Sequence, residues 1–145
     1  MYRHILIASD GSALSERAVA HAVGLARALG ARLTAVTATE PRLTGQAEIA
    51  RMGCTQDEYD KAAADVASRI LDTIVGTAVE SGFSCSPIHV KDAYPADAIL
   101  ATARDLGCDL IVLASHGRRG LAKLLVGSES EKVANRSELP VLIVH

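Results

Sequence analysis

The chain has few aromatic residues, no excess of basic residues and no long apolar run. It contains no tryptophan, one phenylalanine and three tyrosines, so few side chains are available for nucleic-acid bases to stack on. Fifteen Lys and Arg residues stand against 17 Asp and Glu residues, which gives a formal net charge of −2, whereas nucleic-acid-binding domains usually carry a basic excess. No stretch approaches the ~20 apolar residues of a membrane-spanning helix. We therefore expect neither a nucleic acid nor a membrane as partner.

Cysteine and histidine are also sparse. Cys54, Cys85 and Cys108 are odd in number and widely spaced, which predicts neither a disulfide framework nor a metal site. We interpret them as free structural thiols. The N-terminal segment turns polar at once, unlike a signal peptide. These features predict a cytoplasmic protein with no metal site of its own.

The length of 145 residues fits one domain, and we interpret residues 1–145 as a single domain. Short continuous runs of Ile, Leu, Val and Ala predict strands that are buried on both faces. These runs are residues 5–8, 33–36, 110–114 and 141–144, with residues 86–90 as a weaker fifth. Helical patterns separate the runs. The alternation predicts an α/β fold with an open, doubly wound, five-stranded parallel sheet of the Rossmann-like class.

Start and stop signals bound the predicted helices. Pro95 suits the first turn of one helix, and two patterns of Ser or Thr followed three residues later by Glu predict capping boxes at Thr55 and Ser128. The buried face of the helix that follows Thr55 is predicted to comprise Tyr59, Ala63, Val66, Ile70, Ile74 and Thr77. We interpret residues 40–54 as an irregular, mobile surface connection.

The connection of 12 residues at 115–126 is longer than most strand-to-helix loops. Glycines in it allow close approach of the backbone to a ligand, and Arg118 is one of its basic residues. Residues 127–130 then open a helix, whose N-terminus attracts phosphate. This pattern predicts a phosphate-binding site. The alternative is a solvent loop followed by an ordinary helix cap, and neither a Walker P-loop nor a dinucleotide fingerprint is present.

Three segments resemble the universal stress proteins, and the resemblance covers essentially the whole chain. The similar segments are residues 5–12, 109–133 and 139–144. Nucleotide-binding members of this family carry the motif G-x2-G-x9-G-[ST]. Gly117, Gly127 and Ser128 match it, whereas Ala114 stands at its first glycine. The resemblance implies the strand order 3-2-1-4-5.

The resemblance also implies binding of an adenine nucleotide, usually ATP, with or without Mg²⁺ or Mn²⁺, in a dimer that responds to stress. The implied contacts to base and ribose are Ala8, Ser9, Asp10 and Ala38, the residues that close the pocket are Leu113 and Ala114, and those that hold phosphates are Gly117, Gly127, Ser128, Glu129 and Ser130. A carboxylate such as that of Asp10 can accept a hydrogen bond from ribose, but it can equally cap the first helix.

The strand predicted at residues 141–144 has no helix after it to cover it. An open apolar edge can pair with another chain, so we expect a twofold homodimer through this strand. The alternative is an edge strand that is shielded by its neighbours.

Two interpretations of function follow. The first is a nucleotide-binding regulatory protein that is not an enzyme, with slow or no hydrolysis, because no general base is evident unless Asp10 or Glu129 serves. The second is a stress-responsive homodimer that binds no nucleotide and acts through protein contacts. A hydrolase is disfavoured because no G-x-S-x-G elbow is present.

Overall fold

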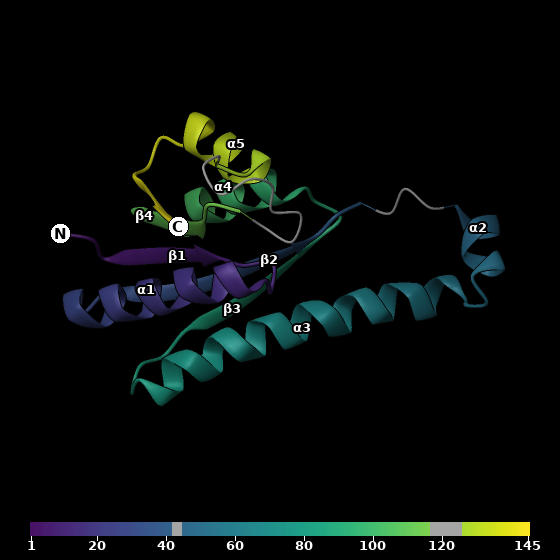
Figure 1. Ribbon diagram of the computed structural model, residues 1–145, viewed down its shortest axis with the longest axis horizontal. Helices are drawn as coiled ribbons and strands as arrows, with labels where there is room; N and C mark the ends of the chain where they lie inside the picture. The colour runs from purple at the N-terminus through teal and green to yellow at the C-terminus, as the bar shows by residue number, and fades with distance from the viewer. Residues whose placement is uncertain (42–44, 117–125) are drawn as a thin grey trace.

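Five parallel strands form one open sheet with the order β3-β2-β1-β4-β5 (Figure 1). The computed structural model describes residues 1–41, 45–116 and 126–145. The strands are β1 (His4–Ala8), β2 (Arg32–Thr39), β3 (Ser86–Lys91), β4 (Leu110–Ala114) and β5 (Val141–Val144). The predicted fold class and strand order are confirmed.

Helices cover both faces of the sheet. The covering helices are α1 (Ala13–Leu29), α3 (Gln56–Glu80), α4 (Pro95–Asp105) and α5 (Ser128–Arg136), whereas the short α2 (Gln46–Arg51) contacts α3. Side chains of α1 and α3 pack into one core cluster, and side chains of α4 and α5 pack into the other, as the two layers of helices in Figure 1 show. Among the described helices, none combines the length and the apolar character that a membrane crossing requires.

The position of β1 between two layers of helices explains why its sequence is continuously apolar. Ile5 and Ile7 lie in the cluster beneath α1 and α3, whereas Leu6 lies in the cluster beneath α4 and α5. All three side chains are fully buried. Because successive side chains of a strand point to opposite faces, a strand covered on both sides needs apolar residues at every position.

The helix ends follow the sequence signals, with one exception. The capping box of Thr55 and Glu58 is present, and Pro95 lies in the first turn of α4. The capping box predicted at Ser128 is wrong, because the cap of α5 is Gly127 and Ser128 is already helical. The Glu131 N–H donates to the Gly127 carbonyl at 2.9 Å, so the helical bonding begins one residue earlier than the sequence pattern indicates.

The segment at residues 40–54 is more ordered than predicted, because it contains α2. Ile49 of this helix is only 1% exposed. An ion pair of 2.6 Å between Glu48 and Arg51 supports the same helical turn. One buried side chain is too little periodicity to reveal a six-residue helix in the sequence, and the prediction of an irregular connection is therefore wrong for residues 46–51. Residues 42–44 lie outside the described part of the chain.

Helix α3 is longer than the sheet that it covers. Its 25 residues span about 37 Å, whereas the eight residues of β2 span only about 26 Å. Consequently the N-terminal half of α3, together with α2, extends beyond the strands (Figure 1). The deeply buried residues of α3 are Ala67, Leu71, Ile74 and Ala78. Of the predicted buried face only Ile74 belongs to them, and Val66 is 40% exposed.

Candidate functional site

A cleft of about 760 Å³ opens at the carboxyl ends of the strands. Residues that follow β1, β2 and β4 form its floor. In the observed order, β2 and β3 lie on one side of β1, and β4 and β5 lie on its other side. The direction in which strands are added to the sheet therefore reverses between β1 and β4. Open parallel sheets bind ligands at such a reversal of strand order, outside the carboxyl edge. The cleft therefore lies where the fold favours a binding site.

The cleft brings together all the predicted site residues that the structure describes. These residues are Ala8, Ser9, Asp10, Ala38, Leu113, Ala114, Gly127, Ser128, Glu129 and Ser130. They come from β1, β2, β4, α5 and the turns that join them. Gly117 and Arg118 were also predicted, and they lie outside the described residues.

One wall of the cleft was not predicted as part of the site. It consists of α3 residues Ala63, Val66, Ala67 and Ile70, and the α4 residues Pro95, Ala98 and Ile99 line the cleft as well. The sequence assigned three of the α3 residues to a buried helix face. Apolar spacing of 3.6 residues looks the same whether a helix covers a sheet or a cleft, so no signal in the sequence separated the two.

Asp10 has a structural role at the start of α1. Its Oδ1 accepts hydrogen bonds from the Ser12 N–H at 3.0 Å and from the Ser15 hydroxyl at 2.8 Å. The hydroxyl of Ser12 itself caps the helix by accepting from the Ser15 N–H. The capping role considered for Asp10 is thus present, while the same carboxylate lines the cleft.

Residues at three helix N-termini line the cleft, and side chains already accept from the N–H groups of two of these termini. The terminus of α1 is held by Ser12 and Asp10, and that of α4 by the carboxylate of Glu129, which accepts from the Ala96 N–H at 3.0 Å. For α5 the cap is Gly127, and no described side chain caps its first turn. The first N–H groups of a helix carry a partial positive charge, so α5 offers the site's anion-binding groups.

Gly127 is required by the space around it. A Cβ atom at this position would lie 2.9 Å from the Ser115 carbonyl oxygen and 3.3 Å from the His116 Cα atom. The Gly127 N–H donates to the same carbonyl of Ser115. This close approach ties the start of α5 to the end of β4, and any side chain would separate them.

Ser130 fastens the same helix at a second point. Its hydroxyl donates to the Ala114 carbonyl at 2.6 Å, and the side chain is buried. Since the proton is used in this bond, Ser130 acts first as an anchor between α5 and β4. Ala114 itself lies within β4, pairs with Val144, and belongs to the core cluster beneath α1.

The titratable groups with shifted pKa values lie outside the cleft lining. Burial raises the pKa of the thiols of Cys85 and Cys108 to about 11, and all three cysteines are free, as the sequence predicted. Burial, aided by Arg32, lowers the pKa of His4. Among the described residues no cluster of His, Cys, Asp or Glu could hold a metal ion.

Comparisons with known proteins identify the family and agree with the fold. A model described as the universal stress protein family matches residues 1–145. The chain is 33% identical to the universal stress protein YxiE of Bacillus subtilis over 99% of both chains. Among solved structures it is similar to a universal stress protein in complex with cAMP (31% identity, 99% and 97% coverage, TM-score 0.74). It is also similar to the protein MJ0577 (27% identity, 99% and 96% coverage, TM-score 0.81).

A third solved structure supports the fold alone. It is a universal stress protein from Archaeoglobus fulgidus in complex with dAMP, with 21% identity, 99% and 98% coverage and a TM-score of 0.74.

Proposed function

This chain belongs to the universal stress protein family, and on that basis we propose that it is a regulatory protein that binds an adenine nucleotide in the cleft at the carboxyl ends of β1, β2 and β4. The nucleotide is ATP or a related adenine nucleotide, and hydrolysis is slow or absent. A relative at 31% identity carries cAMP, which supports an adenine ligand.

The observation that carries this proposal is the start of α5. It is the helix terminus of the cleft that no described side chain caps, and a glycine forms it. It lies in the same cleft as Ser9, Asp10 and Ala38 at the ends of β1 and β2. A ligand with its phosphate on α5 and its nucleoside over the strand ends would contact both of these regions. The cleft volume of 760 Å³ lies within the range of small-molecule sites, which is roughly 300–1,000 Å³.

The walls of the cleft suit a base at one end and an anion at the other. Ala63, Ala67 and Ile70 supply an apolar wall, which is suited to the faces of a purine. Carboxylates of Asp10, Glu40 and Glu129 also line the cleft. A triphosphate would need cations to balance these charges, and Mg²⁺ bound mainly through phosphates and water is the form that this site accommodates.

Ala114 is compatible with nucleotide binding although it replaces the first glycine of the family motif. It has an ordinary position in β4, and it is buried in the core beneath α1. A methyl group held in the core leaves the strand end open to a ligand. The position therefore has no need of the unusual backbone conformations that only glycine adopts.

The same contacts favour a binding protein over an enzyme. Asp10 accepts bonds from Ser12 and Ser15, and Glu129 accepts from Ala96 and Lys132. A general base needs a lone pair directed at the nucleophile, and these two candidate carboxylates have their bonds directed elsewhere. We expect turnover of ATP to be slow or absent.

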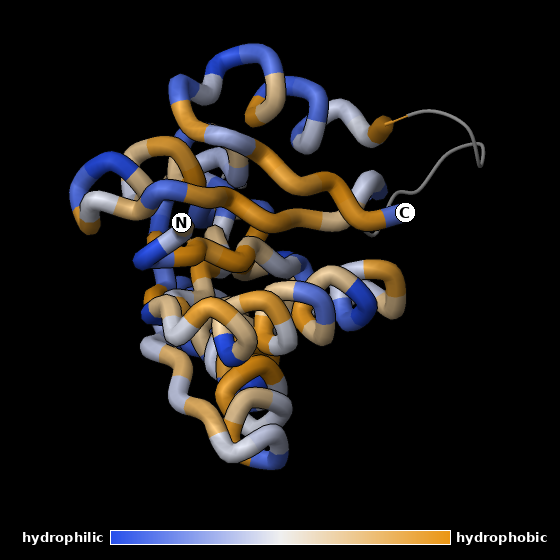
Figure 2. The backbone as a smooth tube through the Cα atoms, turned by 90° about the vertical axis from the view of Figure 1, so that its left-hand side faces the viewer, coloured by the Kyte–Doolittle hydropathy of each residue, from blue (hydrophilic) through white to orange (hydrophobic). Residues whose placement is uncertain are grey.

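The proposal includes a homodimer through β5. This strand pairs with β4 alone and forms one edge of the sheet. Leu142 is 37% exposed on it, and Figure 2 shows the strand that leads to the C-terminus as hydrophobic along most of its length. Two such edges can pair about a twofold axis, which removes both edges from solvent.

Isothermal titration calorimetry of the purified protein with AMP, cAMP and ATP, each with and without Mg²⁺, tests the proposed ligand. We expect saturable binding of adenine nucleotides at one site per chain, and weaker binding of GTP. Absence of heat at millimolar adenine nucleotide would contradict the proposal and favour a stress-responsive dimer that acts through protein contacts alone.

A further inference from the structure

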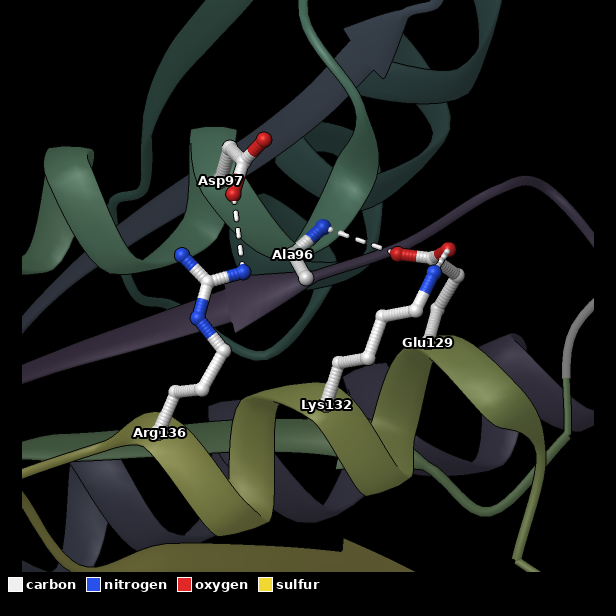
Figure 3. Close-up of polar contacts among 5 residues, drawn as sticks. All are labelled: Ala96, Asp97, Glu129, Lys132 and Arg136. Atoms are coloured by element: carbon white, nitrogen blue, oxygen red, sulfur yellow. Dashed lines mark hydrogen bonds and ion pairs between the residues drawn. The ribbon is translucent and has the colours of Figure 1, made fainter.

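Glu129 lies in the first turn of α5, but its carboxylate is bonded to a different helix. Its Oε2 accepts a hydrogen bond from the Ala96 N–H of α4 at 3.0 Å (Figure 3). Helix α4 has no cap of its own, because the side chain of Tyr94 makes no capping bond and Pro95 has no N–H. The first available N–H of α4 is therefore satisfied by a residue 33 positions later in the chain.

One further contact joins the two helices, and a second, within α5, holds the carboxylate of Glu129 in place. Lys132 donates to Oε1 of Glu129 at 3.0 Å, and Arg136 forms an ion pair of 2.8 Å with Asp97. Figure 3 shows the three α5 side chains directed at the first turn of α4. Glu129 and Arg136 are seven residues apart, which is about two helical turns. Contacts at both ends of this interval fix how α5 is rotated about its own axis.

The capping bond has an electrostatic consequence for the cleft. An acidic residue in the first turn of α5 would oppose a phosphate there if its charge faced the ligand. Here the carboxylate lines the cleft but is bonded to the N-terminus of α4, whose partial positive charge offsets part of its negative charge, and Pro95 of that terminus also borders the cleft. The terminus of α5 is left as the one to which an anion is attracted.

We infer that Glu129 is a positioning residue of the nucleotide site: by capping α4 it holds the first turn of α5 at the cleft and directs the phosphate to α5. This inference rests on the proposed function. The side chain of Glu129 acts through helix α4, and it contacts no phosphate.

Three variants test this inference. Glu129→Ala removes the cap, whereas Glu129→Gln keeps an oxygen that can accept from Ala96 and removes the charge. Glu131→Ala is the matched control, since it removes the same charge from an exposed side chain of the same turn. The measurements are calorimetric affinities for AMP and for adenosine, and amide hydrogen exchange at Ala96 and Glu131.

For Glu129→Ala we expect affinity for AMP to fall about tenfold, the effect of losing one charge-assisted hydrogen bond, while affinity for adenosine stays within about twofold. Glu129→Gln should lose less affinity for AMP than Glu129→Ala, because its amide oxygen still accepts from the Ala96 N–H, and Glu131→Ala should keep the affinity. Exchange at Ala96 and at Glu131 should become faster in Glu129→Ala and remain slow in Glu129→Gln.

Several results would overturn the inference. The first is an unchanged affinity for AMP in Glu129→Ala. The second is a loss of affinity in Glu129→Gln equal to that in Glu129→Ala, which would mean that the charge of Glu129 acts on the ligand directly. The third is a loss of affinity in Glu129→Ala that is equal for AMP and for adenosine. If the unmodified protein binds neither compound, the proposed function fails, and hydrogen exchange still decides the positioning role. Unchanged hydrogen exchange at the Glu131 amide in Glu129→Ala would then contradict the positioning of α5 by Glu129, and faster exchange would support it.

Discussion

At the scale of the residue, Gly127 and Gly24 lie in very different surroundings. An added Cβ at Gly127 would lie 2.9 Å from a backbone oxygen, whereas one at Gly24, on the exposed side of α1, would meet nothing within 4 Å. Neither glycine is among those with a positive φ. The need for glycine at 127 thus comes from packing alone, and this is a property that no spacing rule in the sequence measures.

We predict opposite effects of alanine at these two glycines. Gly127→Ala should lower the free energy of unfolding by about 1–3 kcal/mol, because α5 must move away from Ser115, and it should weaken binding of AMP. Gly24→Ala should raise the free energy of unfolding by roughly 0.5–1 kcal/mol, because alanine is favoured inside helices, with no effect on binding. Urea denaturation measures the free energies, and equal effects of the two changes would contradict this explanation.

Two histidines of the sheet, the buried His4 and the half-buried His89, predict a dependence of stability on pH. Burial, followed by Arg32 for His4 and by Lys91 for His89, lowers both pKa values from 6.5. Below this pH the unfolded chain binds protons that the folded protein does not, so the free energy of unfolding falls as the pH decreases from 7 to 5. In the double variant His4→Gln and His89→Gln the slope should be smaller. A slope equal to that of the unmodified protein would contradict this assignment.

At the scale of the element, the sequence predicted the strands better than the helix surfaces. Ile5, Leu6 and Ile7 are buried on both faces, so a continuous apolar run had one structural explanation. The apolar face of α3 had two possible explanations, because part of this face covers the sheet and part of it lines the cleft. The strand-end residues of the site could be predicted because parallel strands bring their carboxyl ends to one edge. Whether α3 residues line the cleft depends on how far the helix extends beyond the strands, which is a property of the tertiary structure.

Other errors at this scale have the same origin. The short helix α2 depends on Ile49, whose burial only the folded chain reveals. The pattern at Ser128 matched a capping box, but the bond from Gly127 to Ser115 moved the start of α5 by one residue. The capping of α4 by Glu129 was not predicted either, because it joins residues too distant in sequence to be found by local patterns.

The α3 wall gives a prediction about binding. Val66→Glu places a carboxylate in the apolar wall, and we expect affinity for AMP to fall about tenfold because the apolar contact with the base is lost. Val79→Glu is the control, because Val79 is 63% exposed near the other end of α3 and does not line the cleft. Equal affinities for AMP in the two variants, measured by calorimetry, would mean that α3 is no part of the site.

At the scale of the whole molecule, the edge strand β5 determines the proposed assembly. Leu142→Lys adds a charge to the exposed edge, and we expect it to convert the homodimer into monomers by sedimentation equilibrium. Leu29→Lys is the matched control, since Leu29 is 41% exposed at the end of α1, away from β5. A Leu142→Lys protein that remains dimeric would place the interface on another surface.

The most direct test of the nucleotide site is an NMR titration of the ¹⁵N-labelled protein with AMP. We predict that the largest amide shifts occur at residues 127–130 and at Ser9 and Asp10, because the phosphate binds the first turn of α5 and the nucleoside lies over the strand ends. No shifts at millimolar AMP, or shifts confined to Arg69, Thr73 and Thr77 in the neighbouring pocket, which shares Ser9 and Ile70 with the cleft, would contradict the site.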